Sequence, residues 1–144
     1  MVGVIVVILV ALFFYAHQAW STGFFTSSFG SSEAFFLYGS ILLGTLGPLM
    51  HSAIGRRNDV RPAEIATSLF WIAGSIWLLA VFPFDFSHIG DALPEFLRFL
   101  VSWISNDIAW VLLLIGTVGG IAFPVVSGLL YIRVKKLLAL HQLR

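Results

Sequence analysis

Residues 108–132 read IAWVLLLIGTVGGIAFPVVSGLLYI, a run of 25 residues without a charged side chain. A helix needs about 20 mostly apolar residues to cross the hydrocarbon core of a bilayer, so this run is long enough to span a membrane. Its apolar residues do not alternate with polar ones, which favours a helix over a strand of a membrane barrel. The sequence therefore predicts an integral membrane protein.

Three further stretches have the length and composition of membrane-spanning helices, at about residues 2–20, 34–54 and 63–82. The first is not expected to be a cleaved signal peptide, because no basic residue precedes its apolar core and no suitable cleavage site follows it. The expected fold is an all-α bundle of four transmembrane helices, in which residues 1–144 form a single domain.

The composition of the chain agrees with this class and excludes others. Charged residues make up 10% of the chain, whereas a soluble domain carries about 25%. A net charge of +1 gives no broad basic surface, so we expect no nucleic-acid partner. Because the chain has no cysteine, disulfides, thiolate nucleophiles and thiolate metal sites are excluded.

The basic residues predict the orientation. Seven of the eight lie between the second and third spans or after the fourth span, and Arg98 is the exception. Cytoplasmic loops of membrane proteins carry an excess of Lys and Arg. We therefore expect a multi-pass protein of the cell membrane with both termini in the cytoplasm. The seven residues are Arg56, Arg57, Arg61, Arg133, Lys135, Lys136 and Arg144.

Residues 91–105 connect the third and fourth spans on the outer side. Asp91 has the character of a helix N-cap, and Pro94 suits a first helical turn. The polar residues Glu95 and Arg98 would share one face of such a helix. Because about 14 residues are too few to cross a bilayer, we expect an amphipathic helix that lies on the outer surface. It would either close the bundle or bind a partner.

Small residues and prolines recur at every fourth position in the second and fourth spans. The two sets are offset by 76 residues, which is consistent either with a direct repeat of two helical hairpins or with the general abundance of small residues in membrane helices. Small residues four apart allow helix backbones to approach closely. We predict that these two ridges form a tight crossing of the second and fourth spans, or that one ridge mediates self-association. The ridge residues are Ser40, Gly44, Pro48 and Ser52, and Gly116, Gly120, Pro124 and Gly128.

The two ridge prolines each lack a backbone N–H and so free the carbonyl four residues earlier. For Pro48 and Pro124 these carbonyls belong to Gly44 and Gly120. One interpretation is that two kinked helices present carbonyls to a cavity, as in transporters with broken helices. The other is that the kinks are structural and that a nearby side chain, such as Thr45, satisfies the freed groups.

Ionisable residues are expected only at the boundaries of the spans or in loops. Because such groups deep in a membrane mark proton pathways, voltage sensors and carboxylate-dependent exporters, these classes are disfavoured. Near the inner end of the second span, a histidine and the following arginines could hold the phosphate of a lipid headgroup, although arginines here also serve as topology determinants. The residues of this speculative site are His51, Arg56, Arg57 and Arg61.

Catalytic motifs are absent from the sequence, which has no nucleophile elbow, phosphate loop, zincin helix or dinucleotide fingerprint. On the outer side, His17 and His88 could bind a divalent metal with Asp85 and Asp91, but no pair has the helical spacing of a preformed site. We therefore predict no metal, no cofactor and no enzyme activity. A lipid- or metal-dependent enzyme that uses these residues ranks last.

Two functions remain. The first is a small non-enzymatic membrane protein that acts as an accessory or structural subunit, or as a homo-oligomeric scaffold. Its partners would be membrane lipids and either itself or other membrane subunits. The alternative is a small oligomeric channel or transporter whose pathway is lined by the kinked second and fourth spans, since pores without charged side chains exist.

Overall fold

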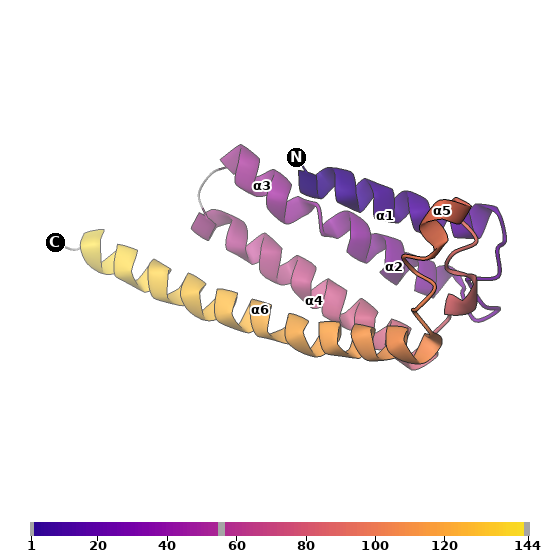
Figure 1. The fold of residues 1–144 in the computed structure, drawn as a ribbon. Helices are drawn as coiled ribbons and strands as arrows, with labels where there is room; N and C mark the ends of the chain where they lie inside the picture. Colours follow the sequence, from indigo (N-terminus) through magenta and orange to yellow (C-terminus); the bar gives the residue numbers. More distant parts are fainter. Residues whose placement is uncertain (1, 55–56, 143–144) are drawn as a thin grey trace.

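The computed structural model describes residues 2–54 and 57–142 of the chain. In these ranges the chain forms helices joined by turns and loops, and Phe25 and Phe84 form an isolated antiparallel β-bridge. The prediction of an all-α fold is confirmed. The helices are α1 (Val2–Ala19), α2 (Ser31–Leu43), α3 (Leu46–Ile54), α4 (Arg57–Val81), η1 (Phe86–His88), α5 (Glu95–Arg98) and α6 (Asn106–Gln142), shown in Figure 1.

Three helical stretches are long and apolar enough to cross a membrane, namely Ser31–Ala53, Asn58–Val81 and Asn106–Leu140. The predicted first span forms an apolar helix that is shorter, Gly3–Ala19. The predicted fourth span continues well past residue 132, because α6 has 37 residues. At about 1.5 Å per residue such a helix is about 55 Å long, which exceeds the hydrocarbon thickness of about 30 Å.

The predicted second span is interrupted, because Gly44 and Thr45 form a turn between α2 and α3. Thr45 donates its N–H at 3.1 Å and its hydroxyl at 2.7 Å to the carbonyl oxygen of Leu42. Pro48 is the third residue of α3. The N–H groups of the first helical turn have no acceptor within the helix, so α3 loses no hydrogen bond through the proline. By contrast, α6 continues through Pro124. Only one of the two ridge prolines therefore accompanies a break in the described helices.

The third span begins earlier than the sequence predicted. α4 starts at Arg57, so Pro62 lies inside the helix instead of opening it. The missing N–H of Pro62 frees the carbonyl of Asn58, which lies in the first turn of the helix. At the side-chain level, Arg61 Nη1 donates to Asn58 Oδ1 at 2.9 Å. The early start places Glu64 about two turns inside the helix.

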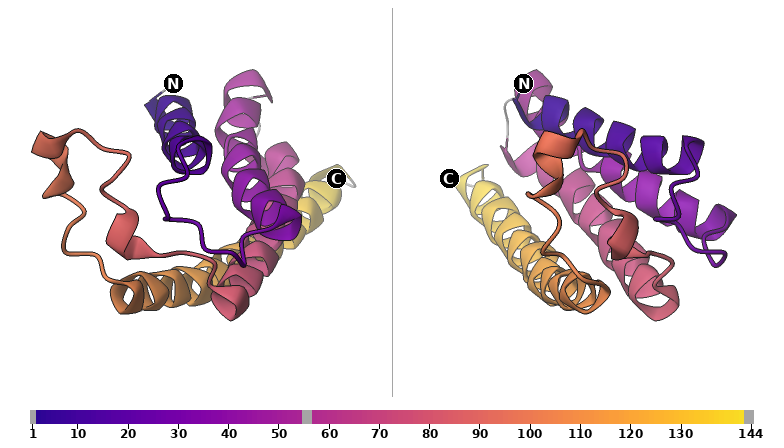
Figure 2. Two further views of the ribbon diagram at one scale, coloured as in Figure 1. Left: turned by 90° about the vertical axis from the view of Figure 1, so that its right-hand side faces the viewer. Right: turned by 45° about the vertical axis from the view of Figure 1, so that its right-hand side comes forward.

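The long helices form one curved layer rather than a closed bundle (Figure 2). α4 is its central member, since it packs against α2 and α3 and also against α6, while α1 packs against α2. The long helices leave a gap between α1 and α6, and there residues 82–105 leave α4, extend toward α1 and return to α6. The predicted tight crossing of the second and fourth spans is wrong, because α4 separates these helices.

The predicted amphipathic helix of residues 91–105 is also absent from the described connection. α5 has only four residues, and its N-cap position is Pro94, not Asp91. Asp91 instead pairs with His88, with 2.8 Å between Oδ2 and Nδ1. Turns follow α5, and there Trp103 Nε1 donates to the carbonyl of Leu100 at 2.8 Å. Such bonds from side chains to nearby groups offer the backbone an alternative to a continuous helix.

The hydrophobic core lies at the end of the layer where the connection between α1 and α2 meets the connection between α4 and α6. Backbone hydrogen bonds join them, from Thr26 N–H to the Pro83 carbonyl at 3.1 Å and from Asp85 N–H to the Phe24 carbonyl at 2.7 Å. Phe24 is fully buried and lies within 6 Å, centroid to centroid, of several aromatic rings. The core residues are Phe24, Leu37, Leu78, Phe84 and Ile89.

Replacing Phe24 by alanine is expected to destabilise the fold by about 3–5 kcal/mol, the usual cost of deleting a buried aromatic side chain. The measurement is thermal unfolding of the purified protein in detergent, followed by circular dichroism. Phe96→Ala provides the control, because the Phe96 side chain is 73% exposed and its loss leaves no cavity. Equal melting temperatures for the two variants would contradict this description of the core.

Candidate functional site

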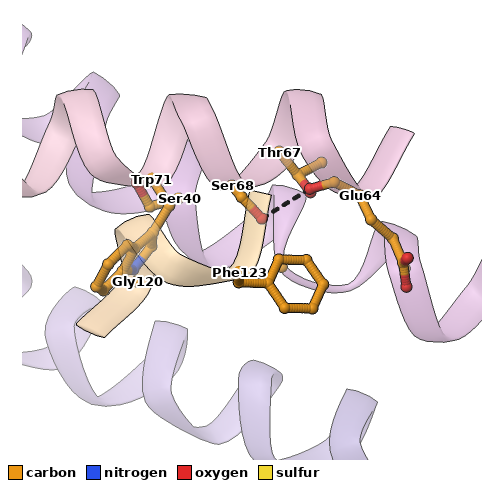
Figure 3. A pocket seen from close by; sticks show the side chains of 9 residues that line it. Ser40, Glu64, Thr67, Ser68, Trp71, Gly120 and Phe123 are labelled. Atoms are coloured by element: carbon orange, nitrogen blue, oxygen red, sulfur yellow. Dashed lines mark hydrogen bonds between the residues drawn. The ribbon is translucent and has the colours of Figure 1, made fainter. Parts of the chain in front are cut away.

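A cavity of about 290 Å³ lies among α2, α3, α4 and α6, beside the break between α2 and α3 (Figure 3). Both predicted ridges contribute to it, one through Ser40 and Gly44 and the other through Gly120. The ridges therefore face a common cavity instead of each other, and side chains of α4 lie between them. The lining residues are Ser40, Gly44, Gly47, Glu64, Thr67, Ser68, Trp71, Gly120 and Phe123.

Four of these residues share one face of α4. Glu64, Thr67, Ser68 and Trp71 follow each other at the spacing i, i+3, i+4 and i+7, which places them on one side of a helix. Glu64 and Trp71 are about 10 Å apart along the helix axis. Figure 3 shows them toward opposite ends of the cavity, with Ser68 between them. This spacing is present in the sequence, but it is a weak signal while Glu64 is expected at the boundary of the third span.

Glycines determine how closely the neighbouring helices approach α4. A Cβ atom on Gly120 would lie 2.5 Å from Cζ3 of Trp71, and a Cβ atom on Gly74 would lie 3.1 Å from Oγ of Ser40. The first distance is shorter than any normal contact, so the indole and the α6 backbone can pack this closely only at a glycine. Gly120 therefore allows close helix packing, as predicted for a ridge glycine, but the helix that packs against it is α4.

The remaining ridge residues have different surroundings. A Cβ atom on Gly116 would be 3.7 Å from Trp71, while one on Gly128 would have nothing within 4 Å. Pro124 is buried. The Ser52 hydroxyl donates to the Leu49 carbonyl of its own helix at 2.8 Å. The ridges are therefore not continuous packing surfaces in the described structure.

Glu64 is the functional candidate that sequence reasoning missed. Its Oε1 lies 2.7 Å from Nε2 of His51 on α3, and its side chain is 18% exposed. The predicted third span of about residues 63–82 places Glu64 at its boundary. In the structure, Glu64 belongs to the stretch Asn58–Val81, which is long and apolar enough to cross a membrane. A carboxylate at such a position marks a functional site more often than a structural one.

Two hydroxyl groups beside Glu64 are available only as acceptors. Thr67 Oγ1 and Ser68 Oγ donate to the Glu64 carbonyl oxygen at 3.0 Å and 2.7 Å. Because a hydroxyl carries one proton, the remaining capacity of both oxygens is to accept. Together with the Glu64 carboxylate they form an acceptor-rich wall of the cavity. The rings of Trp71 and Phe123 form an aromatic part of the cavity lining.

The speculative headgroup site is not assembled among the described residues. His51 contacts Glu64, and Arg61 donates to Asn58. Arg56 lies outside the described residues, and for Arg57 only the helical backbone is described. A lipid phosphate site at this end of the molecule remains a prediction.

The outer histidines have separate partners. His17 is 1% exposed, with Nδ1 2.6 Å from the Thr22 hydroxyl and Nε2 3.2 Å from the Ile89 carbonyl oxygen. His88 pairs with Asp91. Within residues 2–54 and 57–142, no group of three His, Asp or Glu side chains could hold a metal ion. The outer polar residues thus stabilise the connections.

Asp85 shows how one of these connections is stabilised. Its carboxylate accepts hydrogen bonds from the hydroxyl of Ser87 at 2.7 Å and from the N–H of Ser87 at 3.0 Å. These bonds hold the pKa of the Asp85 carboxyl below its ordinary value. Since the pKa is lower in the folded state, ionised Asp85 favours folding above its unfolded-state pKa. This contribution is lost as the pH falls through the folded-state value.

Comparison of the chain with protein-family models, with curated proteins and with solved structures finds no match. Any functional assignment therefore depends on the geometry of the chain itself. Chemically, the cavity is suited to binding, because it combines a carboxylate, two hydroxyl acceptors and two aromatic rings.

A pair of adjacent glycines tests the packing beside the cavity. Gly120→Ala is expected to destabilise the fold by about 1–3 kcal/mol, because the new methyl group overlaps the Trp71 indole. Gly119→Ala is the matched control, since a Cβ atom there meets nothing within 4 Å. It should leave stability unchanged or raise it by up to about 1 kcal/mol through higher helix propensity. Thermal melting in detergent measures the stability of both variants. A melting temperature that is lower for Gly119→Ala than for Gly120→Ala would show that Trp71 does not pack on Gly120.

Proposed function

We propose that the protein is a small non-enzymatic integral membrane protein that acts as an accessory or structural subunit, within a larger membrane assembly or a homo-oligomer. The supporting observation is the open layer of helices. α1 and α6 form its two edges, and among the long helices α1 packs mainly against α2, and α6 mainly against α4. A second helix, supplied by another copy or another subunit, would cover the remaining side.

In this proposal α1, the α2–α3 pair, α4 and α6 each cross the membrane, with both termini in the cytoplasm. The arrangement is consistent with it, because both ends of the chain, the end of α3 and the start of α4 lie at one end of the molecule (Figure 1). The basic residues of the sequence belong mainly to this end. α1 has 18 residues, close to the lower limit of about 17 for a spanning helix.

The free side of α6 has the composition of a helix–helix interface. Val118 and Leu129 are 62% and 66% exposed and share one face of α6, because they lie about three turns apart. Gly119 and Gly128, nine residues apart, lie on the two opposite flanks of this face, and a Cβ atom at either would meet nothing within 4 Å. Exposed apolar side chains alone do not indicate a protein interface, because lipid can cover them. Glycines beside them, however, allow another helix backbone to approach closely, which is how membrane helices gain packing. This surface therefore supports association through α6.

One observation favours the alternative function, a small oligomeric channel or transporter. The break at Gly44 and Thr45 adjoins the cavity that contains Glu64. Transporters place substrate sites at breaks in membrane helices, where backbone groups and polar side chains become available. α6 is continuous through Pro124, so a pathway of this kind would depend chiefly on the α2–α3 break.

Native mass spectrometry of the protein, extracted from its own membrane in mild detergent, tests the proposal. A particle heavier than the 15.9 kDa chain is expected, either with other polypeptides or as a multiple of this mass. Gly119→Leu combined with Gly128→Leu should shift this particle toward the single chain without loss of helicity. A single chain in the unmodified protein would contradict the subunit role. Ion or solute flux through liposomes containing it would then support the alternative.

A further inference from the structure

We propose that the inner cavity is a binding site for a small primary ammonium ion with an apolar substituent. The ammonium group would lie at the Glu64 end, and the substituent would extend toward Trp71. This inference goes beyond the subunit role and does not depend on it. Three features of the cavity lead to it, namely its charge, the hydrogen-bonding capacity of its hydroxyl groups and its aromatic wall.

Glu64 is the one ionisable residue among the described side chains that line the cavity. Its carboxylate, with Oε1 2.7 Å from Nε2 of His51, supplies the negative charge of the cavity. The lining residues include no lysine or arginine among the described part of the chain. Arg61, one turn before Glu64, is hydrogen-bonded to Asn58. Because a partly buried carboxylate is costly without a cation, a positively charged ligand would stabilise it.

The hydroxyl groups specify a ligand that donates hydrogen bonds. The protons of Thr67 and Ser68 are engaged with the Glu64 carbonyl, and only their lone pairs remain for a ligand. Ser40 supplies a further hydroxyl from α2, at the Trp71 end of the cavity. A primary ammonium group carries three N–H donors, which matches a carboxylate with nearby hydroxyl acceptors. A quaternary ammonium ion has no donor and would leave these acceptors unused.

The aromatic side chains of the cavity favour an organic cation over a metal ion as the ligand. Trp71, on the same face of α4 as the acceptors, and Phe123 of α6 also line the cavity, and they offer apolar contact together with attraction between a cation and an aromatic face. Hard metal ions instead require about six or more oxygen ligands, which this set of side chains does not supply. The chemical class that fits both walls is an alkylamine or arylalkylamine of a few carbon atoms.

Isothermal titration of the full chain in lipid nanodiscs with butylammonium chloride tests the proposal. Saturable binding is expected, at least tenfold tighter than for the neutral analogue butan-1-ol and at least tenfold tighter than for sodium. Failure of butylammonium to bind at millimolar concentration would overturn the proposal. Equal affinity for butan-1-ol, which would reveal a purely apolar pocket, or for sodium, which would reveal a general cation site, would also overturn it.

Glu64→Gln removes the charge while retaining the shape of the side chain and an acceptor for His51. It is expected to weaken butylammonium binding by at least tenfold, and Ser68→Ala by about threefold or more, because one hydrogen bond contributes about 1 kcal/mol. Glu95→Gln is the matched control, since Glu95 is an exposed acid of the outer connection. If Glu64→Gln does not fold, Ser68→Ala and Trp71→Leu test the same site. Unchanged affinity in the folded variants would contradict it.

Discussion

The contact between the Trp71 indole and Gly120 determines the spacing of α4 and α6, and much of the molecule follows from it. A glycine is required there because a methyl group would overlap the ring. On the other side of α4, Gly74 provides close approach to Ser40 of α2. In a membrane, where lipid is as apolar as the helices, such close packing provides the association that the hydrophobic effect supplies in water. α4 thus becomes the central helix of the layer.

The position of α4 also explains the cavity beside the break between α2 and α3. Small residues on α2, α3 and α6 face α4, and its large side chain Trp71 keeps the flanking helices apart. The break between α2 and α3 leaves additional space, into which Glu64 and the hydroxyls of Thr67 and Ser68 project. The same packing that stabilises the layer therefore creates a polar space beside apolar walls, in which a charged group can be held.

The sequence predicted the helical class and most of the long helices, because runs such as residues 108–132 are decisive on length and hydropathy alone. It did not predict which helices are neighbours. The two ridges are real small-residue patterns, but a pattern on one helix does not identify its partner, and Ser40 of one ridge and Gly120 of the other both lie against α4. Glycines outside the ridges, such as Gly74, carry equal weight in the packing.

Other differences have local causes. Proline is accepted in the first turns of a helix, so Pro62 did not mark where α4 begins, and Glu64 was consequently assigned to a boundary. Residues 91–105 have the composition of an amphipathic helix, yet only Glu95–Arg98 form one, and the side chain of Asp91, the expected N-cap, is paired with His88. Composition describes the average environment of a segment, whereas these outcomes depend on single contacts.

The central claim is that α4 lies between α2 and α6, and disulfide cross-linking tests it most directly because the chain has no native cysteine. The pair Ser40→Cys and Gly74→Cys should form a disulfide readily, since a Cβ atom on Gly74 would be 3.1 Å from Ser40 Oγ. The pair Ser40→Cys and Gly116→Cys should not form one within a single chain. Efficient intramolecular cross-linking of the second pair, with none in the first, would contradict this account.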